Sequence, residues 1–166
     1  PSKWKGHRIL LHFGAVDWKA DVWVNKVKVG QHTGGFTPFS FDITPALLNG
    51  ENELIVKVWD PTDKGPQPRG KQVSKPGGIW YTPVSGIWQT VWLEPVPIRS
   101  IGNIKTTPDI DRNKLTVEVM TDHQMLSDKL EVKVLEGKQL VAVGSSVNGI
   151  PVEIATVSYT HLRAHE

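Results

Sequence analysis

The pattern that most constrains the fold of this chain is a series of short apolar stretches separated by turn residues. No stretch of about 12 residues keeps a clean 3.6-residue period, which is the pattern of an amphipathic helix. Apolar and polar side chains instead alternate over short runs, and clusters of Gly, Pro, Asn and Asp interrupt them. The chain is therefore predicted to be all-β.

Strands are expected where this alternation is clearest. In the first part of the chain the expected strands are Arg8–Gly14, Lys19–Val24, Lys28–Gln31, Phe39–Asp42, Glu53–Val58 and Gly86–Glu94. The last of these does not keep one period, so it should be covered on both faces or carry a bulge. Thr44 and Pro45 should begin one helical turn, with Thr44 as its cap.

The aromatic residues divide the chain into two parts. All seven Trp and all four Phe lie at or before Trp92, and Tyr159 is the only aromatic residue after it. Pro95 and Pro97 follow Trp92 within five residues and should block the continuation of a sheet ladder. We therefore predict a first domain over residues 1–97 and a second over residues 98–155.

The second part contains five further expected strands with turn residues between them. They are Ile101–Thr106, Lys114–Thr121, Lys129–Leu135, Leu140–Gly144 and Pro151–Ile154. This spacing suits a β-sandwich, although an immunoglobulin-like fold needs about seven strands. Residues 156–166 break the pattern and resemble a tail that recurs on unrelated translated environmental reads, so we expect that segment to be non-native.

Composition excludes several classes of partner and site. Lys and Arg number 19 against 17 Asp and Glu, and no run of five like charges occurs, so neither nucleic acid nor a membrane surface is an expected partner. The chain has no Cys, which excludes disulfides and thiolate metal sites but leaves the compartment open. Its six His residues show no metal-binding spacing, so no metal site is expected.

Several blocks of sequence resemble family 2 glycoside hydrolases, most closely the β-galactosidase-like members. The blocks are Asp21–Asn25, Val29–Thr44, Gly50–Leu54, Gly78–Trp80 and Ser85–Leu93. They keep the order and spacing of that family from Leu10 to Pro97, which makes the resemblance much more specific than any single block would be.

The resemblance implies a jelly-roll, galactose-binding-like β-sandwich over residues 1–97, clipped at its N-terminal side, and a truncated immunoglobulin-like β-sandwich over residues 98–155. In relatives a (β/α)8 barrel follows, whose two catalytic carboxyl groups lie about 5–5.5 Å apart and hydrolyse glycosides with retention. We therefore expect an accessory sugar-binding region at the active-site rim of a parent β-glycosidase. It should have no catalytic residue and no cofactor of its own.

Most residues of these blocks are expected to serve folding rather than sugar contact. Gly34 and Gly35 permit a tight bend, and Phe36 and Phe39 are expected in the core. The family usually has Asn-Gly at the hairpin turn where this chain has Asn25-Lys26. Because Lys is less favourable than Gly at positive φ, the type of that turn stays open.

Sugar-binding candidates concentrate in the Gly- and Pro-rich stretch Asp60–Thr82, since long loops in compact domains are usually functional or disordered. In galactosidase-type members an Asp of this loop meets the substrate or a bound cation. Its counterpart here is Asp63, or Asp60 after a small shift of the alignment. A carboxylate accepts two sugar hydroxyl groups and binds a hard cation, whereas the alternative is a solvated turn residue.

Arg69 and Trp80 complete the expected substrate-binding set, as a hydrogen-bond donor and as a flat face for stacking on a sugar ring. A solvated Arg and a core Trp are the alternatives. The sequence leaves two other functions open: a free-standing carbohydrate-binding module, and a structural sandwich used in oligomer contacts. The parent is expected to act on a β-galactoside, with glucuronide and mannoside as open alternatives, and its homo-oligomeric assembly is also open.

Overall fold

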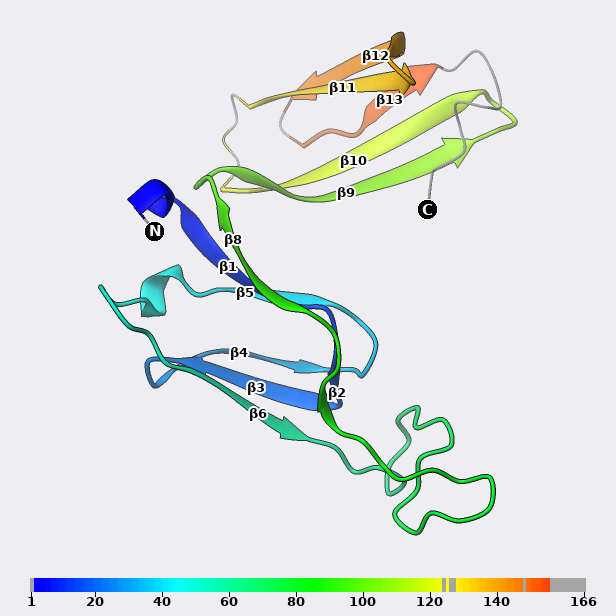
Figure 1. Ribbon diagram of the computed structural model, residues 1–166. Coiled ribbons are helices and arrows are strands. Elements are labelled where there is room, and N and C mark those ends of the chain that lie inside the picture. The colour runs from blue at the N-terminus through cyan, green and yellow to red at the C-terminus, as the bar shows by residue number, and fades with distance from the viewer. Residues whose placement is uncertain (1, 124, 126–127, 148, 156–166) are drawn as a thin grey trace. The chain divides into compact units, whose positions relative to one another are not determined.

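The computed structural model describes residues 2–123, 125, 128–147 and 149–155 (Figure 1). Apart from two short 3-10 helices, every regular element in this part of the chain is a strand, which confirms the all-β prediction. The chain divides into two compact units, Pro1–Val96 and Pro97–Glu166. The predicted non-native segment, 156–166, lies outside the described residues.

The first unit consists of two three-stranded antiparallel sheets and one short strand pair. Its elements are η1 (Ser2–Trp4), β1 (Arg8–Phe13), β2 (Val16–Asp17), β3 (Lys19–Val24), β4 (Val27–Thr33), β5 (Phe39–Asp42), η2 (Thr44–Ala46), β6 (Leu54–Trp59), β7 (Gly86–Ile87) and β8 (Val91–Val96). The sheets have the orders β5-β1-β8 and β4-β3-β6, and β2 pairs with β7.

The core of this unit lies between the central strands of the two sheets. Every second side chain of β1 and of β3 is buried, as expected for strands with one face against a core. These side chains are Ile9, Leu11, Phe13, Ala20, Val22 and Val24, and they belong to one cluster. The unit is therefore a β-sandwich (Figure 1).

Aromatic rings close the side of the sandwich formed by β4 and β5. Phe39 stacks on Phe13 with ring centroids 4.8 Å apart, and its centroid lies 5.5 Å from that of Phe41. Phe41 packs directly on the backbone of β4, because a Cβ atom at Gly30 would lie only 2.2 Å from its ring. The glycine is therefore required for this contact.

The opposite side, formed by β6 and β8, is open. Leu54 is paired with Val24 and Leu93 with Leu11, so both leucines face the core side of their sheets. Each is nevertheless 46% exposed. A groove of about 470 Å³ lies between them, with Ile43 also in its wall.

The predicted strand Gly86–Glu94 is in fact two strands, β7 and β8. Val16 follows Phe13 by three positions, but their partners Ile87 and Val91 are four positions apart, so the run carries one extra residue, as the expected bulge would. The Trp88 amide donates to the Ala15 carbonyl and the Gly14 amide to the Thr90 carbonyl across this irregularity. Beyond it β8 pairs with β1 through Pro95, which lies on an edge strand where its missing N–H costs no ladder bond. The expectation that Pro95 blocks the ladder is therefore wrong.

Two further expectations for single residues are corrected. Phe36 is 64% exposed rather than in the core, because it follows the Gly34-Gly35 bend into a loop. Thr44 does not cap η2: it belongs to the helix, which has no side-chain cap. Its hydroxyl instead accepts a hydrogen bond from the Ile9 amide at 2.7 Å and donates to Asp42 at 2.6 Å.

The β3–β4 hairpin turn has positive φ at both central residues, 48° at Asn25 and 69° at Lys26. These are the signs of a type I′ turn, which matches the twist of a two-residue hairpin. Asn25 also anchors the turn, because its Oδ1 accepts from the Glu53 amide at 2.9 Å and its Nδ2 donates to the Ala46 carbonyl at 2.9 Å. Lys26 also has a positive φ, but within the described part of the chain its side chain makes no hydrogen bond of this kind.

The second unit is also a β-sandwich. Its strands are β9 (Ser100–Asp109), β10 (Lys114–Asp122), β11 (Lys129–Glu136), β12 (Gln139–Val147) and β13 (Val152–Ala155), each overlapping an expected strand. The sheet β13-β10-β9 packs on the pair β11-β12 around Val117, Val119, Val152 and Ile154. Ile104 of β9 pairs with Val119 and so faces the core side, yet it is 54% exposed.

We predict that Lys26→Gly stabilises the first unit. Relief of a left-handed backbone conformation is worth about 1 kcal/mol for a residue with a Cβ atom. Thermal melting should therefore show a higher midpoint. Lys75→Gly, at an exposed position without positive φ, should lower the midpoint instead, and equal effects of both substitutions would contradict the explanation.

We predict that Gly144→Ala destabilises the second unit. A Cβ atom there would lie 2.5 Å from Val152 Cγ1 and 2.7 Å from Ile154 Cγ1, between the two sheets. Overpacking of this kind costs about 1–3 kcal/mol. Urea unfolding should show the loss for Gly144→Ala and little change for Ser145→Ala at the exposed neighbouring position, so similar midpoints for the two variants would refute the close approach.

Candidate functional site

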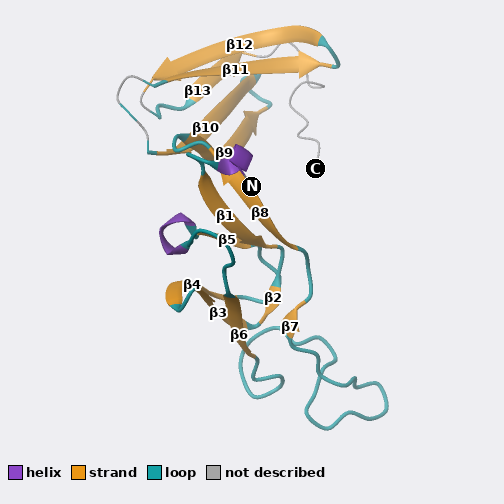
Figure 2. Cartoon of the chain, turned by 60° about the vertical axis from the view of Figure 1, so that its left-hand side comes forward, coloured by secondary structure: helices purple, strands orange, loops and turns teal. Residues whose placement is uncertain are grey.

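A long irregular segment connects β6 to β7 and carries the candidate site. The chain leaves the sandwich after Trp59, and it returns at Gly86 (Figure 2). Two isolated bridges, Gln72 with Tyr81 and Gly77 with Trp80, draw its outer part together. We call residues 60–85 the β6–β7 loop.

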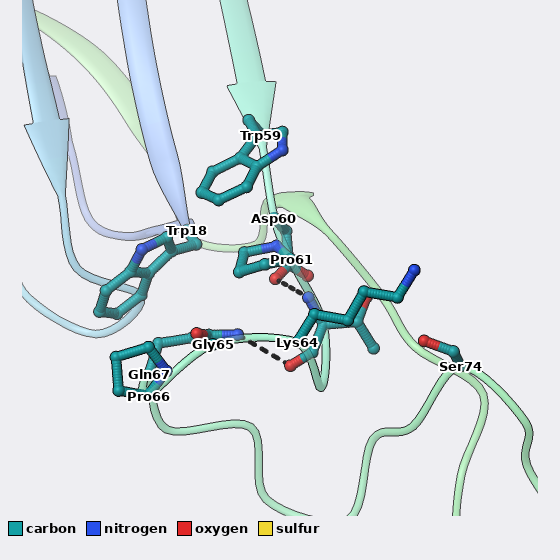
Figure 3. A pocket seen from close by; sticks show the side chains of 10 residues that line it. Trp18, Trp59, Asp60, Pro61, Lys64, Gly65, Pro66, Gln67 and Ser74 are labelled. Atoms are coloured by element: carbon teal, nitrogen blue, oxygen red, sulfur yellow. Dashed lines mark hydrogen bonds between the residues drawn. The ribbon is translucent and has the colours of Figure 1, made fainter.

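A pocket of about 610 Å³ lies where this loop meets the sandwich (Figure 3). Trp59 ends β6 and is opposite Lys19, the first residue of β3, so Trp18 lies beside it at the same end of the sheet. The lining residues are Trp18, Trp59, Asp60, Pro61, Thr62, Lys64, Gly65, Pro66, Gln67 and Ser74. We call this the tryptophan pocket.

Internal hydrogen bonds fix the polar wall of the tryptophan pocket. Asp60 accepts from the Thr62 amide at 2.8 Å and from the Ser85 hydroxyl at 2.6 Å, so it ties the beginning of the loop to its end. Gln67 is buried, and its side-chain amide donates to the Thr62 carbonyl at 2.8 Å. The wall is therefore held in place before any ligand arrives.

Asp63 lies in an adjoining pocket of about 480 Å³ and joins the two limbs of the loop. Its carboxylate accepts from the Ser74 hydroxyl at 2.5 Å and from the Ser74 amide at 3.0 Å. These hydrogen bonds, with a smaller contribution from the charge of Arg69 at 3.9 Å, hold the pKa of Asp63 below its ordinary value. Asp63 is thus ionised at neutral pH and already engaged within the loop.

The structure brings Arg69 and Trp80 to the same place as Asp63. The Arg69 guanidinium lies 5.7 Å from the centroid of the Trp80 ring, and Trp80 shares the second pocket with Asp63. Trp80 is 41% exposed, so it is not a core residue. Asp60 lines the neighbouring tryptophan pocket, and the two pockets share Lys64 and Ser74.

Asp17 and Trp18 were not expected from the sequence, since they come from far earlier in the chain than the loop. Trp18 lines the tryptophan pocket. Burial, and next the nearby charge of Asp60, raise the pKa of Asp17. The only local signal was that this dipeptide interrupts the alternation between two strands.

The structure also bears on metal sites and on membrane-spanning helices. Among the described residues there is no group of three or more His, Cys, Asp or Glu side chains placed to hold a metal ion. No helix in the described part of the chain has the length and apolar character needed to cross a membrane.

Comparison with known proteins finds relatives that are named as β-glucuronidases and β-galactosidases. The chain is 28% identical over 157 residues to a putative β-glucuronidase of Formosa agariphila, a match that covers 92% of this chain and 18% of the relative. It is 38% identical over 95 residues to a β-galactosidase of Thermoanaerobacter pseudethanolicus, which covers 56% of this chain and 12% of the relative. The chain thus spans less than a fifth of either protein.

Solved structures share the fold. A β-glucuronidase from Ruminococcus gnavus in complex with D-glucuronic acid superposes with a TM-score of 0.69 at 23% identity, covering 95% of this chain and 29% of the other. Residues 1–97 match the family profile described as "Glycosyl hydrolases family 2, sugar binding domain". More than half of the sequence is included in that match, so the chain belongs to glycoside hydrolase family 2.

Proposed function

We propose that this chain is the accessory sugar-binding region of a larger family 2 β-glycosidase and that the tryptophan pocket is its carbohydrate contact. The observation that carries the proposal is the pairing of two tryptophans with a fixed polar wall in one pocket. In the parent enzyme this pocket would lie at the active-site rim, and hydrolysis would take place elsewhere in the chain.

The chemistry of the pocket suits a sugar. Trp59 is 57% exposed and offers an apolar surface for the C–H face of a pyranose ring. Asp60 provides carboxylate oxygens with lone pairs left over from its two internal hydrogen bonds, and Lys64 provides donors. Ligand pockets typically combine apolar walls with a few well-placed polar groups.

The residues expected from the sequence have different parts in this proposal. Asp60 contacts the sugar directly. Asp63 and Trp80 line the adjoining subsite, and Arg69 lies against both of them. Asp63 also maintains the loop shape through Ser74. The parent is a retaining β-glycosidase, and the relatives that match this chain are named as β-galactosidases and β-glucuronidases.

A free-standing carbohydrate-binding module is the second candidate. It is favoured by the fact that every residue lining the tryptophan pocket belongs to the first unit. The two candidates share the binding step and differ in whether the chain binds sugar tightly without the rest of an enzyme.

We predict that Trp59→Ala weakens sugar binding about tenfold, which corresponds to ~1.4 kcal/mol, because the ring supplies the stacking surface. The side chain is exposed, so the fold should persist. Isothermal titration calorimetry with galactose and with glucuronate measures the effect. Trp23→Ala, toward the other end of β3, is the control and should bind as the unchanged chain does; equal losses in both variants would remove the pocket from the proposal.

We also predict that the chain alone does not hydrolyse aryl β-galactosides, β-glucuronides or β-mannosides. A retaining mechanism needs two carboxyl groups about 5–5.5 Å apart across a glycosidic bond. Asp60 and Asp63 are both engaged with loop residues. Release of the aryl group above the uncatalysed rate, abolished by Asp60→Asn or Asp63→Asn but not by Asp111→Asn, would show that the chain is catalytic by itself.

A further inference from the structure

A smaller pocket of about 270 Å³ lies at the other side of the Asp60–Ser85 contact. It is built where β2 pairs with β7, with Asp17 directly opposite Gly86. Its lining residues are Asp17, Gly35, Phe36, Gln72, Val84, Ser85, Gly86, Ile87 and Trp88. We call it the Asp17 pocket.

The apolar wall of the Asp17 pocket includes two solvent-exposed aromatic rings. Phe36 and Trp88 meet edge to face, with centroids 5.9 Å apart and planes at 75°. The Trp88 indole N–H donates to the Gly35 carbonyl at 2.7 Å, which fixes the orientation of the ring. Yet Trp88 is 53% and Phe36 is 64% exposed. Two exposed aromatic rings in one pocket form a ready surface for a ligand with an apolar face.

The carboxylate of Asp17 is the polar counterpart of this wall. Among the described residues no donor hydrogen-bonds to it, and its pKa is raised by burial and then by the charge of Asp60. Its Oδ1 lies against the Gly35 backbone, where a Cβ atom would approach within 2.9 Å. A half-buried carboxylate without a donor gains more from a hydroxyl ligand than a solvated one does.

Gln72 supplies a donor in the same pocket. Its Oε1 accepts from the Val84 amide at 2.5 Å, which orients the side chain. The NH₂ group of Gln72 has no hydrogen-bond partner within the described part of the chain. The pocket therefore presents one acceptor and one donor beside two aromatic rings, and the hydroxyl groups and C–H face of a pyranose complement all of them.

We propose that the Asp17 pocket is a second carbohydrate subsite and that it selects an uncharged pyranose over a uronic acid. Among the described residues, Asp17 is the only ionisable side chain that lines it. A uronate carboxylate would therefore meet Asp17, with Asp60 behind Ser85, and no cation in the lining to compensate. This extends the proposed sugar-binding function to a different pocket and assigns its ligand class.

The test uses the indole N–H signals of the full chain in two-dimensional ¹H–¹⁵N NMR spectra. Trp→Phe substitutions at positions 18, 59 and 88 assign the signals that report on the two pockets. The probes are methyl β-D-galactopyranoside and methyl β-D-glucopyranoside, each compared with its own C6 uronate. We expect both uncharged probes or one of them to shift the Trp88 signal saturably, with the matched uronate binding about tenfold more weakly.

Asp17→Asn keeps the size of the side chain and removes its charge. It should weaken the uncharged sugar by about fivefold and reduce the preference over the uronate to below about twofold. Asp111→Asn, an exposed position in the second unit, is the matched control and should leave both affinities unchanged.

The outcomes separate the two proposals. If the Trp88 signal moves while those of Trp18 and Trp59 do not, the Asp17 subsite stands and the tryptophan pocket is wrong. If Trp88 stays unmoved by both uncharged sugars, if the uronates bind equally well, or if Asp17→Asn leaves the preference intact, the Asp17 subsite is wrong, whatever the other two tryptophans show.

Discussion

The packing of β1 against β3 is the constraint on which the rest of the first unit depends. Both strands are central in their sheets, and both bury every second side chain. Their neighbours are positioned by this contact, so the ends of β3 and β6 place Trp18 and Trp59 side by side. The candidate site is thus a loop on a rigid base, which is the arrangement in which loops most often bind ligands. Without the β1–β3 core, the two tryptophans would not be held together in the tryptophan pocket.

Most of the fold could be predicted from the sequence because its strands have local signals. The alternation in Arg8–Phe13 and Lys19–Val24 is strict, and the five strands of the second unit lie between clear turn residues. The errors arose where long-range pairing overrides the local pattern. The run from Gly86 to Glu94 was expected as one strand, but its ends belong to two, which pair with β2 and β1. The broken period of the run indicates an irregularity, whereas its position depends on the partner segment.

The candidate site was only partly predictable for the same reason. Asp60, Asp63, Arg69 and Trp80 lie in one Gly- and Pro-rich loop, so composition indicates their region. Their roles depend on contacts that composition does not show, such as the two hydrogen bonds from Ser74 to Asp63. Asp17 reaches the site only because β2 pairs with β7, which joins segments far apart in sequence. Likewise Phe36 is expected in the core from its sequence context, bend included, and only its exposure in the folded chain shows that the ring faces solvent.

The β6–β7 loop has a consequence for how this domain can diversify. It is part of the chain segment whose ends are brought together when β8 pairs with β1. The entropic cost of closing such a loop grows only with the logarithm of its length, by about 0.6 kcal/mol for each doubling. The ties that shape the loop, Asp60 to Ser85 and Asp63 to Ser74, are internal to it. Insertions and deletions between them therefore alter the pockets at little thermodynamic cost to the sandwich. One scaffold can in this way carry many differently shaped loops, with ligand preference evolving separately from folding.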